Sequence, residues 1–257
     1  MNKEDDMSDQ DDTDQMNGAD SLVQTLLDSG LDTCFTNPGT SEMHFVAALD
    51  HVPGMRSILV LQEGVATGAA DGYYRMSGKL ACTLLHLGPG LANGIANLHN
   101  ARRANSPMIN IIGNHPNYHL GFDAPLTSDI ETLARNFSCW IKSSSTDASL
   151  AQDGADAYTA TLRQSSGSTG QIATLIMGAD AAWGDSPGIG TPNPVPVRSK
   201  VGEATIESIA ELLGKAGNTI LLLEYQAIEA DALTAAGKIA SKTGCRLMTS
   251  TFPSRID

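Results

Sequence analysis

Short apolar runs alternate with longer segments of helical periodicity along most of this chain. The runs are rich in branched aliphatic side chains and predict strands, whereas the segments between them predict helices. The expected strands are 33–36, 57–61, 80–85, 108–112 and 173–177, and the expected helices are 18–29, 41–49, one after residue 63, 91–104, 129–137 and 149–164. Strands that alternate with helices in this way are typical of βαβ units. The predicted fold class is therefore α/β, a parallel sheet with helices on both faces.

A proline-rich segment at 184–198 separates this first domain, 17–183, from the rest of the chain. Its four prolines favour an extended linker. Beyond it, 199–257 predicts helix 203–216, strand 219–223, helix 229–243 and strand 246–249. Two strands are few for an independent α/β domain. We therefore expect an incomplete second α/β unit, cut short at Asp257.

Charge changes this picture mainly at the N-terminus. Residues 1–16 hold seven acidic residues against Lys3, a net −6 of the chain's −13. Such a segment has too few apolar residues to fold, so we expect a disordered acidic leader. The acidic balance argues against nucleic acid as a partner, because phosphate binding needs clustered Lys and Arg. No apolar run is long enough to cross a bilayer, and no signal peptide is apparent, so we expect a cytoplasmic chain with no membrane contact.

The four cysteines give no evidence of a metal site. Cys34, Cys82, Cys139 and Cys245 are far apart in the sequence and lack C-x-x-C spacing. Most of them are expected to be buried as small hydrophobic residues. A zinc site built from His86, His115 and His119 is conceivable by residue type, but no fixed ligand spacing supports it. A solvent-exposed loop is the simpler interpretation of the segment around His115 and His119.

Glu63 is the strongest candidate for a functional residue. It follows the expected strand 57–61 and precedes a helix rich in Gly and Ala. Open α/β sheets bind ligands at the carboxyl ends of their strands, where this carboxylate would lie. Small side chains in the helix allow another backbone or a flat ligand to come close. The alternative is an acidic residue that is merely favoured by the dipole at a helix N-terminus.

Three motifs in order resemble the thiamine diphosphate-dependent enzymes of the acetolactate synthase and benzoylformate decarboxylase type. They are Asn37-Pro38-Gly39-Thr40-Ser41-Glu42, then Gln62-Glu63-Gly64, then His86-Leu87-Gly88-Pro89-Gly90 followed by Asn93 and Asn97. Each motif alone is weak, but their order is specific. The resemblance covers 17–183 as the family's N-terminal pyrimidine-binding domain. Residues 199–257 resemble the beginning of the family's central domain.

The resemblance implies a role for each matching residue. Glu63 corresponds to the family's catalytic glutamate, which hydrogen-bonds the aminopyrimidine and lets the cofactor remove its own C2 proton. His86 matches a histidine that handles protons in the decarboxylase branch, and Thr40 matches a substrate-binding serine; alternatively, His86 is structural and Thr40 an N-cap. The remaining matches imply contacts with the cofactor: Pro38, Gly39, Gly88, Gly90 and Asn93.

The resemblance also implies what must come from elsewhere. The family holds the diphosphate and Mg²⁺ with a G-D-G motif in a separate domain, and no G-D-G occurs in this sequence. No metal ligand is therefore assigned here. We expect a homodimer, or a complex with a chain that carries the diphosphate-binding domain. The predicted reaction is decarboxylation of a small 2-oxo acid, followed by protonation or carboligation.

Two other functions remain open at this point. The chain could be a non-catalytic remnant, or a regulatory or binding subunit that lacks the diphosphate–Mg²⁺ site. A plain nucleotide-binding α/β protein is less consistent with the sequence, because no G-x-G-x-x-G follows the first strand and no Walker motif is present. The choice between decarboxylation and carboligation also stays open.

Overall fold

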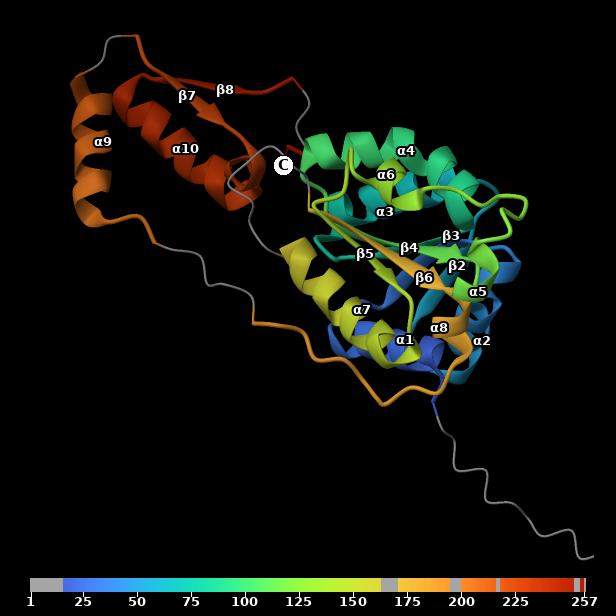
Figure 1. The fold of residues 1–257 in the computed structure, drawn as a ribbon. Coiled ribbons are helices and arrows are strands. Elements are labelled where there is room, and N and C mark those ends of the chain that lie inside the picture. Colours follow the sequence, from blue (N-terminus) through green and yellow to red (C-terminus); the bar gives the residue numbers. More distant parts are fainter. Residues whose placement is uncertain (1–15, 163–170, 195–199, 216–217, 252–254, 257) are drawn as a thin grey trace, which may run out of the picture.

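The computed structural model contains a six-stranded, wholly parallel sheet with helices on both faces (Figure 1). It describes residues 16–162, 171–194, 200–215, 218–251 and 255–256. The strand order is β2-β1-β3-β4-β6-β5. The strands are β1 (Thr33–Asn37), β2 (Arg56–Leu59), β3 (Cys82–Leu85), β4 (Met108–Asn114), β5 (Trp140–Ser144) and β6 (Ile172–Gly178). The predicted parallel α/β fold is confirmed.

The sheet separates two hydrophobic clusters, which explains why its central strands are mostly apolar. One cluster joins the sheet to α1, α2, α7 and α8, and the other joins it to α3, α4 and α6. Figure 1 shows the two sets of helices on opposite sides of the sheet. Every residue of β3 and β6 is buried. These helices, with the short ones, are α1 (Gly18–Asp28), η1 (Thr40–Glu42), α2 (Met43–His51), α3 (Glu63–Ser77), α4 (Leu87–Ala104), α5 (Asn117–Leu120), α6 (Ile130–Ala134), α7 (Asp147–Leu162) and α8 (Ala179–Trp183).

Two local predictions were wrong, and three elements of the first domain were missed. The helix expected at 91–104 begins earlier, because α4 starts at Leu87 and includes Gly88-Pro89-Gly90, with His86 at its N-cap. Pro is well suited to the first turn of a helix, since its missing N–H has no partner there anyway. β2 ends at Leu59, two residues before the expected Leu61, so that Val60 and Leu61 lead into α3. Strand β5 and the short helices α5 and α8 were not predicted.

The second α/β unit consists of α9 (Glu203–Lys215), β7 (Ile220–Leu223), η2 (Tyr225–Ile228), α10 (Ala230–Thr243) and β8 (Arg246–Thr249). Its two strands pair in parallel. Its own buried cluster is small, with Leu223, Ile228 and Ala236 at the centre. Apolar side chains on α9 stay largely exposed, Ile206 and Leu212 among them. The two longer helices and the two strands lie where the sequence predicts them, whereas η2 was not predicted.

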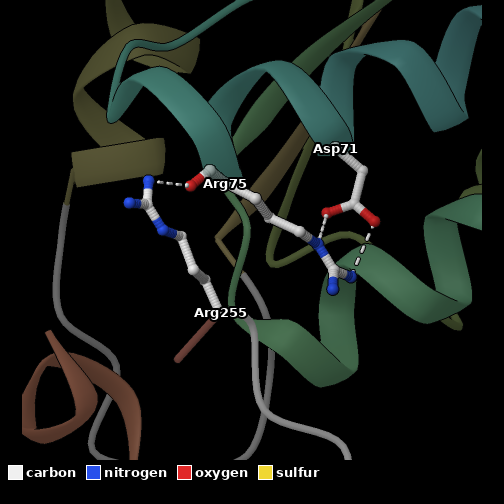
Figure 2. Close-up of polar contacts among 3 residues, drawn as sticks. All are labelled: Asp71, Arg75 and Arg255. Atoms are coloured by element: carbon white, nitrogen blue, oxygen red, sulfur yellow. Dashed lines mark hydrogen bonds and ion pairs between the residues drawn. The ribbon is translucent and has the colours of Figure 1, made fainter. Parts of the chain in front are cut away.

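The chain beyond β8 returns to the C-terminal end of α3 (Figure 2). Arg255 Nη1 donates to the carbonyl oxygens of Arg75 and Met76, both at 3.2 Å. A cation is favourable here, because the last carbonyl groups of a helix lack helical partners and carry partial negative charge. The Arg75 guanidinium itself pairs with Asp71, one turn earlier, at 2.7 Å. This contact joins the second unit to the first.

Two predicted segments lie wholly or partly outside the described residues. Of the acidic leader only Met16 is described, and its carbonyl accepts a hydrogen bond from the Ser186 N–H at 3.0 Å. Of the linker, 184–194 is described and contains no helix or strand. Within the described residues, no helix is both long and apolar enough to cross a membrane.

Candidate functional site

The candidate residues gather at the carboxyl edge of three neighbouring strands. Pro38 and Gly39 follow β1, Glu63 follows β2 after a short connection, and His86 follows β3. Because β2, β1, β3 and β4 are adjacent and parallel, their carboxyl ends meet at one edge of the sheet. This is the edge at which open α/β sheets bind ligands.

Glu63 is the first residue of α3, as predicted, and its carboxylate faces the first turns of α4. Gln62 caps α3 by accepting the Val65 N–H at 3.1 Å. Asn93 Nδ2 donates to Glu63 Oε2 at 3.0 Å. A Cβ at Gly90 would lie 3.5 Å from Glu63 Oε1, so the glycine keeps the approach to this oxygen open. Among the described residues, no hydrogen bond reaches Oε1.

Close packing of α3 on α4 fixes the Glu63–Asn93 pair. Thr67 Oγ1 donates to the Gly94 carbonyl at 3.1 Å, and Asn97 Nδ2 donates to the Gly64 carbonyl at 2.6 Å. A Cβ at Gly94 would come within 2.9 Å of Thr67 Cγ2. The small residues of both helices therefore permit an approach that larger side chains would prevent, as the sequence suggested.

His86 is held by a buried carboxylate that the sequence analysis left without a role. Glu42, in η1, is fully buried, and its Oε2 lies 2.8 Å from His86 Nδ1. The same oxygen accepts the Gly39 N–H at 2.6 Å. The His86 ring lies so close to Gly39 that a Cβ there would overlap it. A turn glycine followed three residues later by Glu was the available signal, because a Glu at that position often hydrogen-bonds back to the turn's N–H.

Burial raises the pKa of Glu42 above its usual value near 4.5, although the Gly39 N–H and His86 oppose the shift. The folded chain thus keeps this proton at pH values where the unfolded chain has lost it. We therefore expect the free energy of unfolding to fall as pH rises from about 4.5 through the raised pKa. Glu42→Gln should flatten this slope, and the exposed Glu207→Gln should retain it. Urea unfolding across this pH range measures all three, and an unchanged slope in Glu42→Gln would contradict the expectation.

The other predicted site residues differ in how closely they approach Glu63 and His86. Thr40 is exposed and is the first residue of η1, so its interpretation as an N-cap was wrong: Gly39 and Glu42 hold the cap positions of η1 and α2. Pro38 is half-buried between β1 and η1. Gly88 faces Ser128, where a Cβ would overlap the serine side chain. Gly88 therefore serves packing, whereas Gly90 lies beside Glu63.

His115 and His119 form a pair with ring centroids 5.4 Å apart, near the exposed Tyr118 and Phe122. Part of the segment expected to be a loop is thus the short helix α5. The described residues contain no group of three or more His, Cys, Asp or Glu side chains able to hold a metal ion. The zinc site considered from His86, His115 and His119 is not assembled among them.

Comparison with known proteins shows which proteins this chain is similar to. Residues 16–135 match the family model "Thiamine pyrophosphate enzyme, N-terminal TPP binding domain". The chain is 49% identical over 242 residues to the Mycobacterium tuberculosis protein named "Putative acetolactate synthase large subunit IlvX", covering 94% of this chain and 46% of that protein. It is 37% identical over 99 residues to benzoylformate decarboxylase of Pseudomonas aeruginosa, covering 38% of this chain and 18% of that one.

A solved structure agrees in fold over nearly the whole chain. It is titled "X-ray structure of a putative thiamin diphosphate-dependent enzyme isolated from Mycobacterium smegmatis", with a TM-score of 0.78 and 27% sequence identity. The match covers 94% of this chain and 46% of that one. The chain thus spans less than half the length of these relatives.

Proposed function

Because the chain carries the N-terminal domain of the thiamine pyrophosphate-dependent enzymes, we propose that it supplies the pyrimidine-binding half of a thiamine diphosphate site. The observation that carries this proposal is the Glu63 carboxyl group, held by Asn93 on one oxygen and open beside Gly90 on the other. A planar heterocycle with a ring nitrogen fits this arrangement, because Oε1 can share a proton with that nitrogen. When bound, the cofactor supplies a nucleophilic carbon that adds to a 2-oxo acid and permits loss of CO₂.

In this proposal Glu63 holds a proton at the pyrimidine nitrogen. Asn93 orients the carboxyl group, Gly90 admits the cofactor beside it, and Gly39 leaves room for the His86 ring. His86 moves a proton to or from the substrate, and Thr40 contacts it from η1. The substrate class is a small 2-oxo acid, and the names of the relatives include both a carboligating synthase and a decarboxylase.

The diphosphate half is proposed to come from outside the described residues. Acidic side chains and a phosphate cradle normally hold Mg²⁺ with a diphosphate, and the described residues hold no metal-binding cluster. We propose a homodimer, or a complex with a chain that carries this half, formed across the faces of α3 and α4. Val65 on α3 and Ala92 and Ala96 on α4 are exposed there. Sedimentation equilibrium tests the homodimer, and a monomer at high concentration would favour the two-chain complex.

Calorimetric titration of the chain with thiamine diphosphate and Mg²⁺ tests the proposal. We expect binding, and an affinity about 10- to 100-fold weaker in Glu63→Gln, because a hydrogen bond to a charged group contributes about 1.5–3 kcal/mol. Glu207→Gln, on the exposed face of α9, is the matched control and should bind like the wild type. Equal affinity in Glu63→Gln would favour a non-catalytic role for the chain, whereas no binding at all would direct the search to a partner chain that carries the diphosphate-binding half.

A further inference from the structure

Glu42 makes the contacts expected of a side chain that holds a second side chain, His86, in place. It is completely buried, yet its partners come from three separate parts of the fold. Gly39, after β1, donates its N–H to Oε2, and His86, after β3, lies against the same oxygen. Gly113 in β4 lies against Oε1, where a Cβ would overlap the carboxyl group. Oε1 is buried and has no hydrogen-bond partner within the described residues.

We infer that Glu42 is a positioning residue that fixes the His86 ring with its proton on Nδ1 and leaves Nε2 as the acceptor. In its ionised form Glu42 can only accept hydrogen bonds, so the Oε2 that accepts the Gly39 N–H also accepts from the His86 ring. Nδ1 must therefore donate. The second nitrogen of the ring then carries the lone pair when the imidazole is neutral. In water, free histidine favours the opposite tautomer, so the buried acid selects a form that the side chain would not adopt alone.

The choice of tautomer matters for the proposed site. This consequence rests on the proposed function, which assigns proton transfer to His86. A fixed hydrogen-bond partner for one ring nitrogen sets the tautomer of the imidazole. It also sets the direction in which the second ring nitrogen points. The ring also lies against Gly39, and this packing together with the contact to Glu42 Oε2 favours one ring orientation. Nε2 is the atom left to receive a proton from substrate or to return one. The space left by the missing side chain of Gly113 holds the Glu42 carboxyl group beside the His86 ring.

Long-range ¹H–¹⁵N correlation spectra of the chain, at pH values where the imidazole is uncharged, read the tautomer directly. We expect the His86 shifts of an Nδ1–H ring in the wild type. Glu42→Met keeps a similar shape without an acceptor, and should shift most of the population to the Nε2–H form. Glu42→Gln retains an oxygen acceptor and should restore Nδ1–H. A purely structural role for Glu42 would not separate Met from Gln in this way.

Each outcome decides the inference. An Nε2–H ring in the wild type, or an unchanged tautomer in Glu42→Met, overturns it. Should Glu42→Met fail to fold, a nuclear Overhauser effect between the Nδ1 proton and the Gly39 amide proton of the wild type identifies their shared acceptor, and its absence overturns the inference. These spectra need no cofactor. Failure of cofactor binding would therefore remove the proposed function while leaving the tautomer result intact, and the converse also holds.

Discussion

Gly113→Ala is expected to lower the free energy of unfolding by about 1–3 kcal/mol, the usual cost of forcing an extra methyl group into a well-packed core. Gly113 lies in β4 near the middle of the sheet, paired with Met177 of β6, and is buried. Its missing Cβ is the space that the Glu42 carboxyl group occupies. A methyl group there must displace either a central strand or the buried acid. Equilibrium unfolding in urea measures the loss.

Two controls separate this clash from a general effect of replacing glycine. Gly237→Ala lies within α10, where an added Cβ meets no atom within 4 Å. It should be neutral or stabilising by about 0.5–1 kcal/mol, because Ala is the better helix former. In a Glu42→Ala background the Gly113→Ala cost should largely disappear, since the methyl group then has room. If Gly113→Ala lowered the free energy of unfolding equally in both backgrounds, the Glu42 carboxyl group would not be what fills the space beside Gly113.

The parts of the fold that follow from local sequence were predictable. β4 and β6 are mostly apolar runs buried on both faces, with Asn110 and Thr174 as their buried polar residues, and both were expected from that pattern. β5 reads Trp140-Ile141-Lys142-Ser143-Ser144, with no such run, because it pairs only with β6 at the edge of the sheet. Its existence depends on a neighbour some 30 residues later, which no local window contains.

The residues of the candidate site also differ in whether the local sequence could predict their role. Glu63 could be found because a strand, a carboxylate and a small-residue helix follow one another directly. The contact of Glu42 with Gly39 has a local signal, but its part in holding His86 could not be found, because His86 is 44 positions away and Gly113 lies in another strand. Gly88 and Gly90 share one motif, but the structure separates them: one packs on Ser128 and the other lies beside Glu63. Such distinctions arise only when distant segments are brought together.

Glu63→Gln is expected to slow hydrogen–deuterium exchange at C2 of bound thiamine diphosphate by about 10²–10⁴-fold, the usual contribution of a positioned acid or base. The physical reason lies in what each side chain can do with a proton. A carboxyl oxygen beside Gly90 can share its proton with the pyrimidine nitrogen. The Gln amide can donate a hydrogen bond there but cannot give up the proton. Quenched-flow ¹H NMR of the C2 proton, with the chain in excess over cofactor and Mg²⁺ present, measures the rate.

Asn93→Ala and Glu207→Gln make this test specific to the Glu63 carboxyl group. Asn93 contributes one hydrogen bond to Oε2, so its loss should slow exchange by only about 2- to 10-fold. Glu207 lies exposed on α9 and should leave the rate unchanged. If bound cofactor exchanged equally fast with wild type and Glu63→Gln, the carboxyl group would have no part in activation. The position of Glu63 would then reflect only the preference of acidic residues for the first turn of a helix.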